Sequence, residues 1–218
     1  AGFTVNTSAS NSNITIASSA TIAGAGKALT LNSGTGTISV TSALSGMGNV
    51  SFTGNEVNWT ATIAGSGTLT LKPTTATNVI NLGAASDAGT STLDILASEL
   101  ALLGSTFTGV TIGGGSQSGN ISIAAASTFS NPVTFTTSGS TILSGNLTAS
   151  GSAGIFVTNG LQVSGAARTI TSASGDITLA AVDATGTAYG LTLTTTGGTI
   201  NVARVGGTAA LASLTTSA

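Results

Sequence analysis

Short apolar pairs, each separated by one small polar residue, recur along the whole chain. Apolar residues two positions apart point to the same side of a β-strand, so each pair predicts a short strand with one buried face. Glycine-rich turn signals such as Gly113-Gly114-Gly115 separate the pairs, which predicts strands of about five residues every 9 to 14 residues or so. The pairs are Ile14/Ile16, Leu29/Leu31, Ile38/Val40, Val50/Phe52, Leu69/Leu71, Val110/Ile112, Ile121/Ile123, Val133/Phe135, Ile177/Leu179, Leu191/Leu193 and Ile200/Val202.

This pattern admits two all-β architectures, a sandwich of antiparallel strands and a β-solenoid whose equivalent strands stack in parallel. A sandwich normally carries aromatic core residues and charged outward residues, whereas this chain is 4% aromatic and its outward positions are mostly Thr, Ser and Asn. Stacked coils place like residues above one another, which favours hydroxyl and amide ladders. We therefore predict a parallel β-helix, with the antiparallel β-sandwich as the alternative. Coils of about 20 residues, about 4.8 Å apart, give about eleven coils and a rod about 50 Å long.

Residues 91–104 depart from the alternating pattern. Four leucines between positions 93 and 103 fall on one helical face, and Ser91 with Asp94 resembles a capping box. We predict a short helix near residues 92–103, inserted in a single solenoid module that covers residues 1–218.

Charged residues make up only 5% of the 218 residues, against about a quarter in ordinary domains, and the net charge is −2. Four Lys and Arg in total are too few for a phosphate-binding footprint, so nucleic-acid binding is not expected. No stretch approaches about 18 consecutive apolar residues, so no membrane span is expected. The chain has no cysteine, which excludes disulfides and thiolate metal sites.

Most catalytic chemistry lacks its usual residues here. Without histidine and cysteine the common nucleophile–base triads cannot form, so we predict a non-enzymatic protein without a cofactor. Asp176 and Asp183, seven residues apart, are the candidate calcium ligands, against the alternative of turn aspartates that accept backbone hydrogen bonds. The six carboxylates are Glu56, Asp87, Asp94, Glu99, Asp176 and Asp183.

Two ligand classes need neither charge nor metal. Carbohydrate sites usually stack aromatic rings on sugar faces, which makes Trp59 the candidate glycan contact, although its alternating segment also allows it to point into the core. Thr-x-Thr pairs such as Thr35/Thr37 and Thr192/Thr194 are typical of ice-binding solenoids, but such a face requires one fixed coil length and the gaps between the pairs vary.

Five segments of the chain have the character of repeat units or recurring insertions: residues 98–103, 107–113, 129–135, 197–202 and 211–215. These segments resemble the large bacterial exported proteins of the filamentous-haemagglutinin-like, β-strand-repeat adhesin family. The resemblance implies a right-handed β-helix, export across a bacterial envelope, and work as an adhesin or surface fibre. It carries no functional residue over to this chain.

The two ends of a solenoid expose unpaired strand edges, which are normally capped, paired or blunted by charge. Both ends of this chain read as strands almost without charge, with Phe3 and Val5 at one end and Leu211 and Leu214 at the other. We predict that these residues pair end to end with further coils, of the same polypeptide or of neighbouring subunits. The sequence thus favours an extracellular or cell-surface structural and adhesive module; a glycan- or host-surface-binding module and an ice-binding solenoid are the alternatives.

Overall fold

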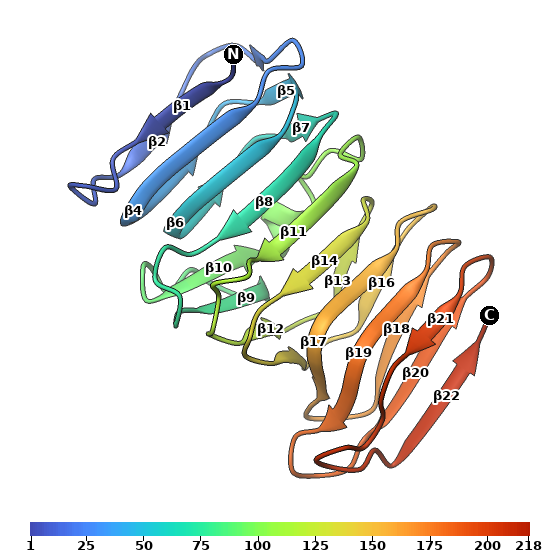
Figure 1. Cartoon of the computed structure of the whole chain (residues 1–218). Helices are drawn as coiled ribbons and strands as arrows, with labels where there is room; N and C mark the ends of the chain where they lie inside the picture. Colours follow the sequence, from blue (N-terminus) through green and yellow to red (C-terminus); the bar gives the residue numbers. More distant parts are fainter.

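All strand ladders of the structure are parallel, and successive coils stack along one axis (Figure 1). The structure is a computed structural model that describes residues 1–218, and it forms a β-solenoid of about ten turns. The predicted parallel β-helix is therefore confirmed, and the antiparallel sandwich is excluded because no antiparallel pair occurs. Ten turns lie close to the eleven expected from coil length.

Three faces surround the core, and we number them in the order in which the chain visits them. Face one consists of β1 (Phe3–Asn6), the first halves of β4 (Leu29–Val40) and β6 (Val50–Trp59), β8 (Thr68–Lys72), β11 (Gly109–Gly113), β14 (Val133–Thr136), the first halves of β17 (Ile155–Val163) and β19 (Ile177–Ala184), and β21 (Ile200–Val202).

Face two follows face one around a bend, and the four long strands run through that bend. It consists of β2 (Ile14–Ile16), the second halves of β4 and β6, β10 (Thr92–Leu96), β9 (Val79–Ala84), β12 (Ile121–Ile123), β15 (Thr141–Leu143), and the second halves of β17 and β19.

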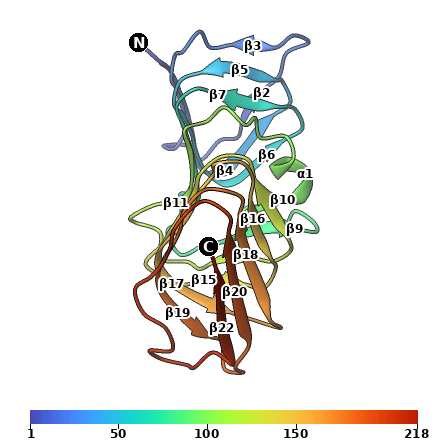
Figure 2. The same ribbon diagram turned by 90° about the vertical axis from the view of Figure 1, so that its right-hand side faces the viewer.

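Face three is divided into two sheets. Near the N-terminal end it consists of β3 (Ile22–Ala23), β5 (Leu44–Met47) and β7 (Ile63–Gly65); beyond α1 (Ala97–Leu100) it continues as β13 (Ser127–Phe129), β16 (Leu147–Ala149), β18 (Arg168–Ser172), β20 (Gly190–Thr195) and β22 (Ser213–Ser217). Figure 2 shows these two sheets above and below the level of α1.

The core is a continuous stack of apolar side chains inside the three faces. On face one Leu29 pairs in register with Val50, Val50 with Leu69, and Val110 with Val133, so each coil contributes an apolar residue at the same position. The outward neighbours Thr30, Ser51 and Thr70 stack in the same way. The expected neutral ladders are present, and they arise because parallel pairing repeats every side-chain orientation from coil to coil.

Asparagine side chains extend the pairing of coils into the turns. The side-chain oxygens of Asn49, Asn120 and Asn146 accept the backbone N–H of a residue in the following coil, at 2.9–3.0 Å. A neutral amide thus takes the place of a backbone carbonyl where the chain turns, which satisfies backbone donors of the next coil without adding charge.

One coil departs from the regular length. On face one, Val50 and its partner Leu69 are 19 residues apart in the chain, whereas Leu69 and its next partner Val110 are 41 residues apart. The extra residues form β10 and α1, so face two gains a strand that face one lacks. β10 pairs with β9 on one side, but no ladder joins its other side to β6, which lies beside it.

The predicted helix is present but short. Only Ala97–Leu100 is helical, and residues 92–96 form β10 instead. Leu93 and Ile95 are both fully buried and point inward on either side of Asp94, so strand alternation and pairing with β9 prevail over the helical spacing of the leucines. The helix cap also differs from the expected one. At the start of the helix the backbone N–H of Leu96 donates to Glu99 Oε2 at 2.8 Å, and Asp94 does not take this role.

We expect the core stack to be sensitive to loss of volume. Phe135 is fully buried, pairs with Ile112 and Val157, and lies edge-to-face on Phe129 with ring centroids 6.1 Å apart. Phe135→Ala should lower the free energy of unfolding by about 3–5 kcal/mol. Phe156→Ala, on the outer side of the adjacent coil, is the control and should cost less than half as much in urea denaturation; equal losses would contradict this assignment of the core.

Candidate functional site at the open ends and the coil junction

The two ends of the solenoid each leave strand edges without a partner. At the N-terminal end β1 and β2 pair only with β4, and β3 pairs only with β5. At the C-terminal end β21 pairs only with β19, and β22 pairs only with β20. Each of these strands therefore offers one row of backbone N–H and C=O groups in the geometry of a parallel ladder.

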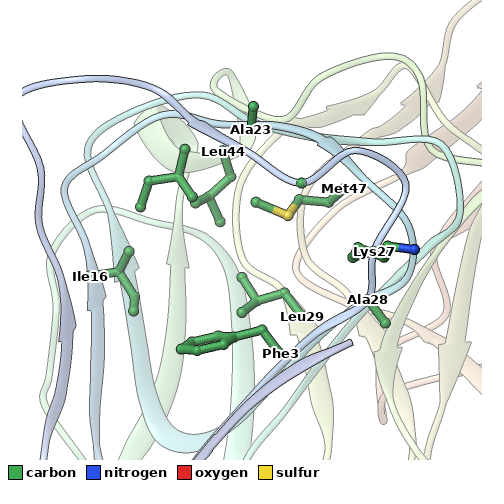
Figure 3. A pocket seen from close by; sticks show the side chains of 10 residues that line it. Phe3, Ile16, Ala23, Lys27, Ala28, Leu29, Leu44 and Met47 are labelled. Carbon is green, nitrogen blue, oxygen red and sulfur yellow. The ribbon is translucent and has the colours of Figure 1, made fainter. Parts of the chain in front are cut away.

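An apolar cavity of about 210 Å³ opens at the N-terminal end between the three faces (Figure 3). Phe3, Leu29, Leu44 and Met47 line it, and Lys27 is its only charged lining residue. Phe3 is 60% exposed although it stacks in register on the buried Leu29. The core stack thus reaches the end of the rod and stops there without a covering layer.

The C-terminal end is more exposed. All five residues of β22 are exposed, including Leu214 at 36%, which pairs with the buried Leu191. The strand begins at Ser213, two residues later than the segment expected from the sequence; Leu211 precedes it, is half-buried and packs on the core. Among the four predicted end residues, Phe3 and Leu214 are exposed edge positions, whereas Val5 and Leu211 are half-buried.

Trp59, the candidate glycan contact, lies in the core with 2% of its surface exposed. Its indole N–H donates to the carbonyl of Glu99 at 2.7 Å. Burial and an occupied N–H leave no ring face on which a sugar can stack.

Asp176 and Asp183, the candidate calcium ligands, lie at opposite ends of β19. Asp176 accepts the backbone N–H and hydroxyl of Thr199, and these hydrogen bonds lower its pKa. Asp183 accepts the N–H of Thr208, which is the main cause of its lowered pKa, and lies 4.0 Å from the guanidinium of Arg204. Asp176 thus repeats the role of the turn asparagines, and each carboxylate has its own partners in the next coil.

We call the place where β6 and β10 lie side by side without a ladder the coil junction. The structure brings the other four carboxylates together there, an arrangement that the sequence did not predict. One carboxylate oxygen from each of Glu56, Asp87 and Asp94 lies within 4.8 Å of the other two, and we call these three residues the junction cluster. Glu56 lies on β6, Asp94 on β10, and Asp87 on the loop 85–91 that covers them. The sequence held one signal of this cluster: Asp94 lies between the apolar residues Leu93 and Ile95, as in an alternating strand. We interpreted this segment as helical instead.

Carboxylates replace the missing ladder between β6 and β10. Glu56 Oε1 accepts the N–H of Val57 at 2.9 Å, and Glu99 Oε1 accepts the N–H of Trp59 at 2.9 Å. Glu99 Oε2 also accepts the N–H of Leu96 on β10, so this one carboxylate joins the two strands. The N–H groups of Val57 and Trp59 on β6 are thus satisfied although β10 offers them no carbonyl.

Burial makes these acids weak. It raises the pKa of Glu56 to about 8, with a further contribution from the negative charge of Asp87, although the N–H of Val57 opposes the shift. Burial also raises the pKa of Glu99 to about 7 against the N–H groups of Leu96 and Trp59. The only ion pair of the protein joins Arg204 to Asp183, so no Lys or Arg neutralises the junction.

No protein-family model, curated protein or solved structure matches this chain. A membrane-crossing helix, which needs a long apolar run, is not found in the structure. The β-solenoid architecture is consistent with that of β-helix repeat proteins in general.

The junction predicts an unusual pH dependence of stability in metal-free buffer. Glu56 and Glu99 bind protons more tightly in the folded protein, with pKa values of about 8 and 7, than at their ordinary value of 4.5. The folded state therefore holds more protons than the unfolded chain between these values, so the free energy of unfolding falls as pH rises from about 5 to about 9. The groups facing them are the carboxylates of Asp87 and Asp94, which add to this fall.

Glu56→Gln should remove the part of the fall near pH 8 and raise Tm at about pH 9 by at least about 3 °C over the unmodified protein. Asp176→Asn is the control and should leave the slope of Tm against pH unchanged. A Tm that stays level or rises over this pH window contradicts the assignment.

Proposed function

We propose that this protein is a non-enzymatic structural and adhesive β-solenoid module of a bacterial extracellular fibre or surface adhesin, which assembles end to end through its open strand edges. The observation that carries the proposal is the pair of uncovered ends. β1 and β22 are both edge strands, with exposed Phe3 and Leu214 continuing the apolar stacks of the core.

Parallel coils supply the mechanism of assembly. A further coil laid on either end repeats the register that already holds the coils together, so backbone pairing and core burial both continue across the joint. Covering the cavity beside Phe3 removes apolar surface from water, which favours association. The added coils belong either to the same polypeptide or to a neighbouring subunit stacked head to tail.

The scarcity of charge supports this arrangement. Natural edge strands are usually protected by charged residues, especially Lys, or by proline. Here Lys27 lies at one end and Arg204 at the other, and neither β1 nor β22 contains a charged residue. The edges are therefore not protected against pairing.

The adhesin and export parts of the proposal rest on the resemblance to β-strand-repeat exported proteins. Of the segments that carry it, residues 98–103 include most of α1 and the turn after it, and residues 107–113 include β11 and the two residues before it. A non-enzymatic role fits the junction cluster, because Glu56 and Asp94 are each 1% exposed and a polymeric substrate cannot reach between them.

Self-assembly can be tested by placing charge on the edges. We expect the unmodified chain to form linear end-to-end oligomers as concentration rises, and the double variant Phe3→Lys with Leu214→Lys to weaken association at least about tenfold, because edge lysines repel an incoming strand. Sedimentation velocity and electron microscopy measure both. Val79→Lys, at an apolar position 37% exposed on the side of the rod, is the matched control and should assemble normally. Isolated monomers of the unmodified chain at every concentration would contradict the proposal.

Ice binding is the second candidate, because face three carries a regular threonine array. Thr169 and Thr171 pair in register with Thr192 and Thr194, which pair with Thr215 and Ser217, so the motif does recur there at one coil length of 23 residues. Thermal hysteresis that is present in the unmodified protein, lost in Thr171→Lys and retained in Thr134→Lys on face one would favour this candidate over the structural one.

A further inference from the structure

We infer that the junction cluster is a calcium site, formed by Glu56, Asp87 and Asp94 on the outer side of face two. The three carboxylates come from separate parts of the chain and converge only because β10 is inserted beside β6. Asp94 points outward between the inward Leu93 and Ile95, yet it is 1% exposed because the loop 85–91 lies over it.

Neighbouring amides orient the aspartates of the cluster. The side-chain amide of Asn58 donates to Asp87 Oδ2 at 3.1 Å, and that of Asn81 donates to Asp94 Oδ1 at 3.2 Å. The backbone N–H of Ala88 donates to Asp94 Oδ2 at 2.7 Å, which ties the loop to β10. Each carboxylate oxygen retains acceptor capacity beyond these bonds, so both aspartates are held in place and still able to bind a cation.

Glu56 provides the independent observation that points to a cation. Glu56 is only 1% exposed, and its Oε2 is a buried oxygen without a hydrogen-bond partner. A buried carboxylate oxygen without a donor is costly, and it becomes more so beside two further carboxylates. A bound divalent cation satisfies this oxygen and offsets two of the three negative charges of the cluster, and no Lys or Arg of the chain does so.

The oxygen geometry and chemistry fit Ca²⁺. Calcium binds oxygens at about 2.3–2.6 Å, so two of its ligands are at most about 5 Å apart, and three oxygens within 4.8 Å of one another can share one ion. The donors are all hard oxygens, which favours Ca²⁺ or Mg²⁺ over zinc or copper. Mg²⁺ requires tighter octahedral geometry near 2.1 Å, whereas Ca²⁺ tolerates ligands from two strands and a loop. The exposed position of Asp87 leaves room for water to complete its coordination.

Calcium at this place would strengthen a joint of the solenoid where the face-two ladder is interrupted. The ladder is interrupted between β6 and β10, and the cluster spans that interruption from Glu56 to Asp94. One ion therefore ties the N-terminal coils to the coils beyond the insertion and holds the loop 85–91 against face two.

The test measures calcium binding by the unmodified protein directly. At about pH 8, isothermal titration calorimetry with CaCl₂ after chelator treatment should show one site per chain with a Kd of about 1 mM or tighter, and saturating Ca²⁺ should raise Tm by roughly 3–10 °C. MgCl₂ at the same concentration should bind at least about tenfold more weakly.

Asp87→Asn is the principal variant because its side chain is exposed and its loss should not disturb the core; it should weaken Ca²⁺ binding at least about tenfold. Glu56→Gln should do the same, and a normal circular dichroism spectrum shows that it folds. Asp176→Asn, which removes a carboxylate from the far part of the rod, is the matched control and should bind Ca²⁺ unchanged. The inference is overturned if the unmodified protein binds no Ca²⁺ up to about 10 mM, or if Mg²⁺ binds equally well. It is also overturned if Asp87→Asn and Glu56→Gln bind Ca²⁺ as tightly as the unmodified protein, whether or not Asp176→Asn loses binding.

Discussion

The pairing of each coil with the coils above and below it is the constraint on which this structure depends. In a parallel ladder every residue meets its counterpart one coil away, so one orientation pattern is repeated along the whole rod. Leu29, Val50 and Leu69 therefore form one apolar stack, and Thr30, Ser51 and Thr70 form the neutral row beside it. Like charges at the same outward position of successive coils would lie directly opposite each other and repel. This constraint fits the low charged composition of 5%.

The junction between β6 and β10 shows what happens where this pairing is interrupted. β10 adds a strand to face two without a counterpart on face one, and β6 loses the carbonyls that would accept its N–H groups. Glu56 and Glu99 supply carboxylate oxygens instead. Four of the six carboxylates of the chain, Glu56, Asp87, Asp94 and Glu99, thus lie at this interruption of the face-two ladder.

The ends of the rod interrupt the pairing in a different way. There the ladder stops while the apolar stack continues to exposed side chains, Phe3 at one end and Leu214 at the other. The junction uses carboxyl oxygens to satisfy lone donors, whereas β1 and β22 at the ends contain no acidic residue. This difference is the physical basis for interpreting the ends as surfaces that pair with further coils and the junction as an internal joint.

The sequence by itself determined the strands, their inward faces and the solenoid class, because period-two alternation and the lack of charge are local properties of the chain. It also identified the end residues Phe3 and Leu214 and the departure at 91–104. Only the tertiary structure decided that residues 92–96 pair as a strand, that Trp59 points inward, and that Glu56 meets Asp87 and Asp94. Residues 31 and 38 positions apart in the chain become neighbours through coil register, and register depends on the length of every intervening turn, which no local pattern encodes.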